Sequence, residues 1–197
     1  MNLPNKLTLL RIILVPFFVL FLLVDAIPLS PVFALVVFIA ASITDFFDGH
    51  YARKHNMVTD FGKFADPLAD KILIISAFCC FIQTGLIGAV PVIIVLFREF
   101  AVTSVRLVAA SKGKVVAANM WGKAKTVSQI VAVIVALVLQ IVLKLGGFSA
   151  EVSGSFGIIT NVVVWVSVIF TVISGIVYLK DLSLIHISEP TRQEAIS

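Results

Sequence analysis

Four aspartates form two closely spaced pairs in a chain that is otherwise rich in apolar residues. Asp45 and Asp48 are three residues apart, and Asp66 and Asp70 are four residues apart. Either spacing places two side chains on one face of a helix. Carboxylates gathered near hydrocarbon need counter-charge, and hard divalent cations such as Mg²⁺, Mn²⁺ or Ca²⁺ prefer oxygen ligands. The pattern predicts a divalent-metal site, and the plainer alternative is a set of solvated helix-end charges paired with neighbouring basic residues.

The residues around these pairs indicate what a bound metal would hold. Gly49 and Gly62 carry no side chain and Ala52 carries only a methyl group, so a bulky ligand can approach the backbone. Arg53 adds a planar cation that suits a phosphate group. Together with the carboxylates, these residues predict a binding site for a phosphate-bearing ligand.

The composition indicates that this site lies in a membrane protein. Of the 197 residues, 60% are hydrophobic and 13% are charged, about half the usual charged share of a soluble domain. One membrane span takes about 20 apolar residues, so the chain is long enough for five or six spans. These values exclude a soluble globular protein, a disordered chain and a nucleic-acid-binding module. The adjacent Cys79 and Cys80 have neither disulfide-framework nor zinc-ligand spacing, and we expect both to be packing residues.

We expect an all-α integral membrane protein with six transmembrane helices, because six apolar runs are separated by segments with Gly, Pro or charge. The runs are Leu7–Val24, Val32–Phe47, Pro67–Ile87, Pro91–Ala110, Thr126–Leu145 and Phe156–Leu179. The first run resembles a signal peptide because Lys6 and Arg11 precede an apolar stretch, but no small-residue cleavage site follows it. We therefore expect it to remain as the first span.

These helices must position the acidic pairs. The first pair falls at the end of the second run and the other at the start of the third. A short loop joins the two runs, so we expect antiparallel neighbours whose four carboxylates meet at one end of an interhelical cleft. Asp45 would lie about 6 Å below the helix end at Gly49. A ligand there would have its phosphate at the membrane surface and its other end in lipid.

The basic residues predict which side of the membrane this site faces. Twelve of the fifteen Lys and Arg fall at alternate loops or their edges; they are Lys6, Arg11, Arg53, Lys54, Lys63, Lys71, Lys112, Lys114, Lys123, Lys125, Lys180 and Arg192. Only Lys144 lies at a loop on the opposite side. The positive-inside rule then places both termini and the acidic site in the cytoplasm.

The last sixteen residues, 182–197, differ from the rest of the chain. They are polar, aperiodic and without a helix face. We expect a single membrane domain over residues 1–181 and assign no chemistry to the tail, which is either disordered or foreign to the domain.

The acidic pairs and their neighbours together resemble a known family signature. Asp45-x2-Asp48-Gly49-x2-Ala52-Arg53-x8-Gly62-x3-Asp66-x3-Asp70 resembles the motif of the CDP-alcohol phosphatidyltransferase family at every defined position. Pro4–Thr8 with Arg11 resembles the family's amino-terminal segment. Arg98-Glu99, Arg106 and Trp121–Thr126 resemble the bacterial branch that makes phosphatidylglycerophosphate. The resemblance extends over nearly everything up to Asp181.

Members of this family displace CMP from a CDP-linked lipid by the attack of an alcohol. The resemblance implies a six-helix fold, often a homodimer, with a cytoplasmic active site and two Mg²⁺ or Mn²⁺ ions. By carry-over, Asp45, Asp48 and Asp66 would bind metal, and Asp70 would lie near the second ion and act as general base. The residues implied for binding the CDP-lipid are Gly49, Ala52, Arg53 and Gly62, with Asn5 and Thr8 as nucleotide or pyrophosphate contacts.

A group of basic residues predicts an acceptor that carries its own phosphate. The candidates are Arg106, Lys114, Lys123, Lys125 and Arg98. Arg106 lies about 6 Å inside the fourth span and Arg98 about 18 Å, where an arginine needs a partner or a polar cavity. Glu99 adjoins Arg98, but neighbouring helical residues point in different directions. Whether Arg98 and Glu99 pair with other helices or serve the acceptor stays open at this point.

We therefore expect a multi-pass enzyme of a bacterial plasma membrane that converts CDP-diacylglycerol and glycerol 3-phosphate into phosphatidylglycerophosphate and CMP. Inositol phosphate meets the same charge argument, and only the branch resemblance ranks it second. A divalent-cation transporter is a different alternative, but transport sites usually lie near the midplane between repeats. A non-catalytic lipid-binding scaffold is the third, and the complete carboxylate set disfavours it.

Overall fold

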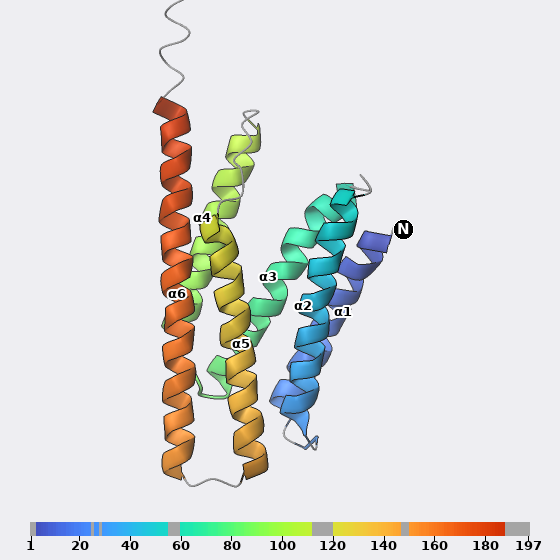
Figure 1. The fold of residues 1–197 in the computed structure, drawn as a ribbon, viewed down its shortest axis with the longest axis vertical. Coiled ribbons are helices and arrows are strands. Elements are labelled where there is room, and N and C mark those ends of the chain that lie inside the picture. The colour runs from blue at the N-terminus through green and yellow to red at the C-terminus, as the bar shows by residue number, and fades with distance from the viewer. Residues whose placement is uncertain are drawn as a thin grey trace, which may run out of the picture.

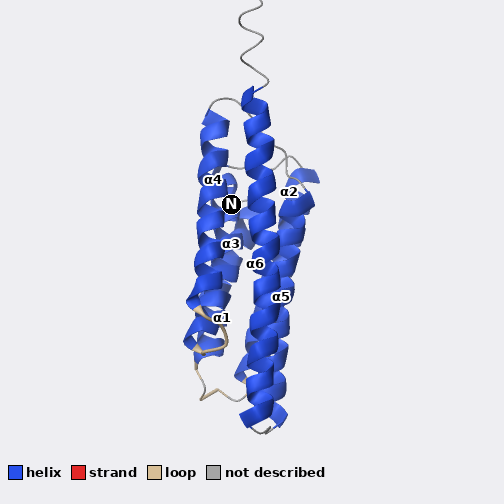
Figure 2. Ribbon diagram, turned by 90° about the vertical axis from the view of Figure 1, so that its left-hand side faces the viewer, coloured by secondary structure: helices blue, strands red, loops and turns tan. Residues whose placement is uncertain are grey.

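The computed structural model describes residues 3–187 apart from positions 25, 28, 55–59, 112–119 and 147–149. All the regular secondary structure in these ranges is helical (Figures 1 and 2). The helices are α1 (Leu3–Leu23), α2 (Ser30–Lys54), α3 (Asp60–Gln83), α4 (Ala89–Ser111), α5 (Met120–Gly146) and α6 (Ala150–Ile187). The predicted all-α fold is confirmed for this part of the chain.

Successive helices run in opposite directions, so alternate helix ends gather at the two ends of the bundle (Figure 1). The starts of α1, α3 and α5 lie at the same end as the last turns of α2, α4 and α6. The signature from Asp45 to Asp70, called the acidic motif below, spans the α2–α3 connection and therefore lies at this end. The two described ends of the chain, Leu3 and Ile187, lie there as well.

The helices associate as two groups of three. In the first group α1 packs against both α2 and α3, and in the second α6 packs against α5 and α4. The groups meet mainly where α2 packs against α5, and α3 also touches α4 and α5. Figure 1 shows α1 to α3 on one side and α4 to α6 on the other.

The core consists of large rings and small residues on the inner helix faces. Phe18 and Phe38 are fully buried, and their ring centroids lie 5.8 Å apart. Ala132 and Ala136 are buried on α5, where a small side chain lets helices approach closely. Of the two cysteines, Cys80 is buried in this core and Cys79 is exposed, so the expected packing role is confirmed for Cys80 alone.

The outer faces carry large apolar side chains. On α4, Phe97 is 76% exposed and Leu107 is 72% exposed. A soluble protein rarely exposes apolar surface of this extent, whereas a bilayer covers it. Three helical segments are long and apolar enough to cross a membrane: Asn5–Leu23, Met120–Gly146 and Ser153–Asp181. The described parts of α2 and α3 contain shorter apolar stretches, so the remaining three of the six predicted spans stay a prediction.

Helix boundaries differ from the apolar runs at several places. α2 continues beyond Phe47 to Lys54, and α3 starts at Asp60, because a helix continues into polar sequence once it has formed. α3 ends at Gln83, four residues before the expected Ile87. The chain leaves the helix there through Gly85, whose φ is +72°, a conformation that glycine adopts without strain.

The last helix continues six residues beyond residue 181, the expected end of the membrane domain. α6 extends to Ile187 and contains 38 residues, a length of about 57 Å at the usual rise per residue. The hydrocarbon layer of a bilayer is about 30 Å thick. At the usual tilts of about 0–40°, α6 is therefore too long to lie wholly inside the hydrocarbon. Residues 188–197 lie outside the described part of the chain.

Candidate active site

The acidic motif is carried by the helical ends on either side of the α2–α3 connection. Asp45 and Asp48 belong to the last three turns of α2, and Asp66 and Asp70 belong to the first three turns of α3. Both segments lie at the same end of the bundle as the start of α1 (Figure 1). The structure thus confirms that both pairs are helical and places them at one end of the fold.

The side chains of the motif lie outside the described residues. They are those of Asp45, Asp48, Gly49, Ala52, Arg53, Gly62, Asp66 and Asp70. Their predicted roles in binding metal and the CDP-lipid therefore stay predictions.

The start of α1 presents polar residues on its inner face. Thr8 is fully buried, and Asn5 and Arg11 are 7% and 1% exposed. The same face continues with the apolar Val15 and Phe18, since residues three or four apart share one side of a helix. The inner face of α1 is therefore polar only at the end of the bundle that carries the acidic motif. Asn5 and Thr8, the two residues implied as nucleotide contacts, belong to that polar part.

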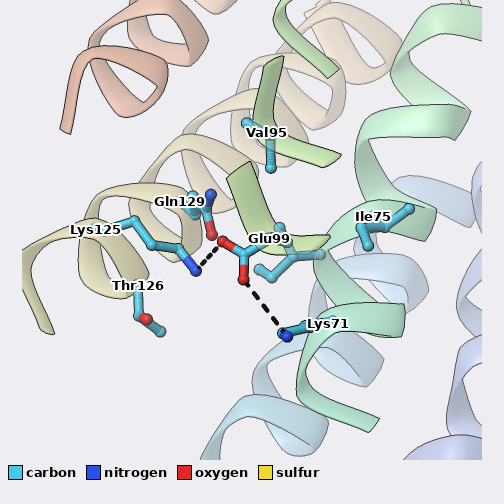
Figure 3. A pocket seen from close by; sticks show the side chains of 8 residues that line it. Lys71, Ile75, Val95, Glu99, Lys125, Thr126 and Gln129 are labelled. Atoms are coloured by element: carbon cyan, nitrogen blue, oxygen red, sulfur yellow. Dashed lines mark ion pairs between the residues drawn. The ribbon is translucent and has the colours of Figure 1, made fainter. Parts of the chain in front are cut away.

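A buried carboxylate pairs with cations from three helices (Figure 3). The Glu99 side chain, on α4, is 7% exposed, and its Oε1 lies 2.5 Å from Lys125 Nζ on α5. Oε1 also lies 3.0 Å from Nη1 of Arg98, and Oε2 lies 3.9 Å from Nζ of Lys71 on α3. Charged groups at this depth need such pairing. We call these four side chains the Glu99 cluster.

Arg98 pairs with its own neighbour and with α6. Its Nη1 donates to Glu99 Oε1 over 3.0 Å, and its Nη2 donates to Ser174 Oγ over 2.7 Å. Arg98 and Glu99 meet although neighbouring helical residues point in different directions, because the long arginine side chain reaches around the helix to the adjacent carboxylate. Gly175 lies beside this arginine, and a Cβ added there would be 3.1 Å from Arg98 Cγ.

A small cavity adjoins the Glu99 cluster. Its lining residues are Lys71, Ile74, Ile75, Val95, Glu99, Lys125, Thr126 and Gln129. It has room for about one water molecule. Gln129 Nε2 donates to Thr171 Oγ1 on α6 over 3.1 Å, and Lys71 Nζ donates to Thr103 Oγ1 on α4. The wall of the cavity is thus fixed by polar contacts on several helices.

The predicted acceptor residues occupy different places. Lys125 and Arg98 belong to the Glu99 cluster. Arg106 lies on the exposed part of α4, with its guanidinium carbon 5.5 Å from the centroid of the Tyr178 ring on α6. Lys123 is exposed at the start of α5, and Lys114 lies outside the described residues. The described contacts therefore bring together two of the five residues.

Sequence reasoning missed two members of this site. The sequence pattern indicates for Lys71 only a basic residue at a loop edge or a partner of the acidic pairs, and it indicates no role for Gln129. Both lie within apolar sequence, where a polar or ionisable side chain normally faces a partner inside the bundle. That signal could have identified both as inward-facing residues, although it could not have named Glu99 as the shared partner.

The chain is similar to known proteins over nearly its whole length. A protein of Bacillus subtilis named CDP-diacylglycerol–glycerol-3-phosphate 3-phosphatidyltransferase is 45% identical over 88% of this chain and 91% of its own. A protein of Rickettsia bellii with the same name is 34% identical over 91% of this chain and 94% of its own. A probable phosphatidylglycerophosphate synthase of Mycobacterium tuberculosis is 39% identical over 90% of this chain and 79% of its own.

A sequence model of one family covers most of the chain. It matches residues 1–173 and is described as CDP-alcohol phosphatidyltransferase. The match includes the whole acidic motif, the polar start of α1 and the Glu99 cluster. The chain therefore belongs to the CDP-alcohol phosphatidyltransferase family.

Proposed function

We propose that this protein transfers the phosphatidyl group of CDP-diacylglycerol to sn-glycerol 3-phosphate, a step of phospholipid biosynthesis that yields phosphatidylglycerophosphate and CMP. The observation that carries the proposal is the 45% identity, over nearly the full length of both chains, to a Bacillus subtilis protein named for this reaction. The Rickettsia bellii relative carries the same name. The complete acidic motif and the basic residues near the same end of the bundle support the same reaction.

The carboxylates of the motif fit a divalent-metal cofactor. Enzymes of this family are generally dependent on divalent metals. Four carboxylates on the facing ends of α2 and α3 form an all-oxygen donor set, which suits Mg²⁺ or Mn²⁺. Asp45, Asp48, Asp66 and Asp70 would hold two ions. When bound, the ions would neutralise the diphosphate and stabilise the departing CMP.

The chain's own residues supply positioning and proton transfer. Asp70 accepts the proton of the acceptor hydroxyl. The hydroxyl oxygen then forms a bond to the lipid-linked phosphorus, and the bond between that phosphorus and the CMP oxygen breaks. Arg53 pairs with the diphosphate, beside the open wall of Gly49, Ala52 and Gly62. Asn5 and Thr8 contact the nucleotide from α1. Holding both substrates in line supplies a large part of the acceleration.

The acceptor phosphate would be held by cations on α4 and α5 and in the connection between them. The proposed set is Arg106, Lys114, Lys123, Lys125 and Arg98. Arg106 and Lys123 are exposed and open to a soluble substrate, while Lys125 and Arg98 act from within the Glu99 cluster. Inositol phosphate would satisfy the same cations, so the names of the relatives rank it second.

The proposed setting is a bacterial plasma membrane crossed six times. Three long apolar helices and relatives from bacteria support a membrane location, and the distribution of basic residues supports a cytoplasmic active site. The catalytic domain would comprise residues 1–181. A homodimer is proposed from the family resemblance.

The direct test uses purified protein in detergent with CDP-diacylglycerol, Mg²⁺ and a panel of acceptors, and it measures the release of CMP. We expect release with glycerol 3-phosphate, loss of release on addition of EDTA, and recovery with excess Mg²⁺. Release with inositol phosphate alone would retain the metal chemistry and change the acceptor. No release with any acceptor would contradict the proposed function.

A further inference from the structure

We propose that Glu99 is a positioning residue for the acceptor: its carboxylate holds Lys125 of α5 and Lys71 of α3 in fixed places on either side of the small cavity. The inference rests on the proposed function and adds a residue to which that function assigns no role. Glu99 does not need to contact either substrate.

The first support is the place of Glu99 between the two groups of helices. Lys71 belongs to the first group, on α3, and Lys125 belongs to the second, on α5. One carboxylate on α4 lies 2.5 Å from the lysine nitrogen of α5 and 3.9 Å from that of α3. Figure 3 shows Glu99 between the two lysines. Glu99 therefore joins the two groups where α3 contacts α4 and α5.

The second support is the location of Lys71 in the sequence. It directly follows Asp70 on α3, the proposed general base. A contact that fixes Lys71 against α4 and α5 also fixes the turn of α3 that carries this base relative to the acceptor's cations. Hydrogen bonds from Lys71 to Thr103 and from Gln129 to Thr171 hold the surrounding helices.

The third support is the charge balance on the acceptor side. Arg98 and Lys125 share the single oxygen Oε1 of Glu99. Without that carboxylate, two cations would repel each other in a poorly solvated interior. Lys125 would then turn away from the cavity, and the acceptor phosphate would lose a cation that is already in place before binding.

The test compares Glu99→Gln with the unmodified protein. Glutamine keeps the shape of the side chain and removes its charge. The KM for glycerol 3-phosphate is expected to rise about tenfold or more, with the KM for CDP-diacylglycerol within about twofold of the original value. Glu99→Asp keeps the charge on a shorter side chain and should raise the KM for glycerol 3-phosphate by a smaller factor.

Two further variants separate positioning from a general loss of packing. Thr160→Val changes a buried polar residue of α6 outside the cavity, and its KM for glycerol 3-phosphate should stay within about twofold of the original. In a Lys125→Gln background, Glu99→Gln should add little, because two residues that act through one contact are not additive. A full additional increase of KM in that background would overturn the proposal.

The outcomes distinguish this inference from the proposed function. An unmodified protein that releases no CMP with glycerol 3-phosphate contradicts the function itself. An active unmodified protein whose KM for glycerol 3-phosphate is unchanged by Glu99→Gln contradicts only the role of Glu99. If Glu99→Gln does not yield folded protein, Glu99→Asp decides, and an unchanged KM for glycerol 3-phosphate in that variant overturns the role.

Discussion

At the scale of single residues, charge within apolar sequence is the feature that most strongly indicates function. Charged side chains inside a membrane helix are costly unless they are paired or line a polar cavity. The four carboxylates of the motif and the Glu99 cluster are two such groups. We propose that the first binds metal and the CDP-lipid and that the second serves the acceptor.

The role of Asp70 is tested by Asp70→Asn, which removes the proposed base and one metal ligand. Turnover with glycerol 3-phosphate should fall by about 100-fold or more, since general base catalysis contributes about 10²–10⁴-fold. Binding of CDP-diacylglycerol, measured by equilibrium dialysis, should be largely kept, because three carboxylates and Arg53 remain. Unchanged turnover would exclude Asp70 as the base.

The role of Arg106 is tested by Arg106→Ala. The KM for glycerol 3-phosphate should rise about tenfold or more, because a hydrogen bond to a charged group contributes about 1.5–3 kcal/mol. The KM for CDP-diacylglycerol should not change. Arg106 also lies over the Tyr178 ring, so Tyr178→Phe, which keeps the ring, is the matched control and should leave both values unchanged. An unchanged KM in Arg106→Ala would remove Arg106 from the acceptor site.

At the scale of helices, existence and order could be predicted from the sequence, whereas the ends and the contacts could not. All six apolar runs correspond to helices, because each run is long and bounded by polar, Gly or Pro residues. The extension of α2 to Lys54 and of α6 to Ile187 could not be predicted from hydropathy. An apolar run marks only the part of a helix that is buried in lipid, whereas the helical hydrogen bonds continue into the polar residues that follow. The Arg98–Ser174 contact joins residues 76 positions apart, which no local pattern reveals.

The contact between α4 and α6 gives a test at this scale. A Cβ at Gly175 would be 3.1 Å from Arg98 Cγ, whereas at Gly157 on the same helix nothing lies within 4 Å. Gly175→Val should lower the thermal unfolding midpoint in detergent, with a loss of about 1–3 kcal/mol from overpacking. Gly157→Val is the matched control and should be close to neutral. Equal midpoints for the two variants would contradict the close approach of α6 to Arg98.

At the scale of the whole molecule, the antiparallel order of helices brings all the proposed chemistry to one end. The starts of α1, α3 and α5 share that end (Figure 1), which is why residues as far apart as Asn5, Asp66 and Lys125 can serve one site. The sequence predicted this through the alternation of its basic residues. The separation into two groups of three helices had no comparable signal, because interior and lipid-facing side chains are both apolar.

The proposed orientation can be tested with single cysteines at the two ends of α5. Met120 is 75% exposed and Leu145 is 64% exposed. In a background with Cys79 and Cys80 replaced by alanine, Leu145→Cys should react with a membrane-impermeant maleimide in intact cells. Met120→Cys should react only after the membrane is permeabilised. The reverse pattern would place the acidic motif outside the cytoplasm.

The Glu99 cluster also has a consequence for the biogenesis of the protein. α4 carries Arg98, Glu99 and Arg106 and is not among the helices that are apolar enough to span a membrane unaided. A single charged residue at a helix centre costs about 2.5–3.5 kcal/mol during insertion by the translocon. Glu99 obtains its nearest counter-charge from Lys125, which is synthesised after α4. The nascent α4 should therefore remain at the translocon, or beside α3, until α5 has been synthesised. We expect α4 and α5 to insert into the membrane together.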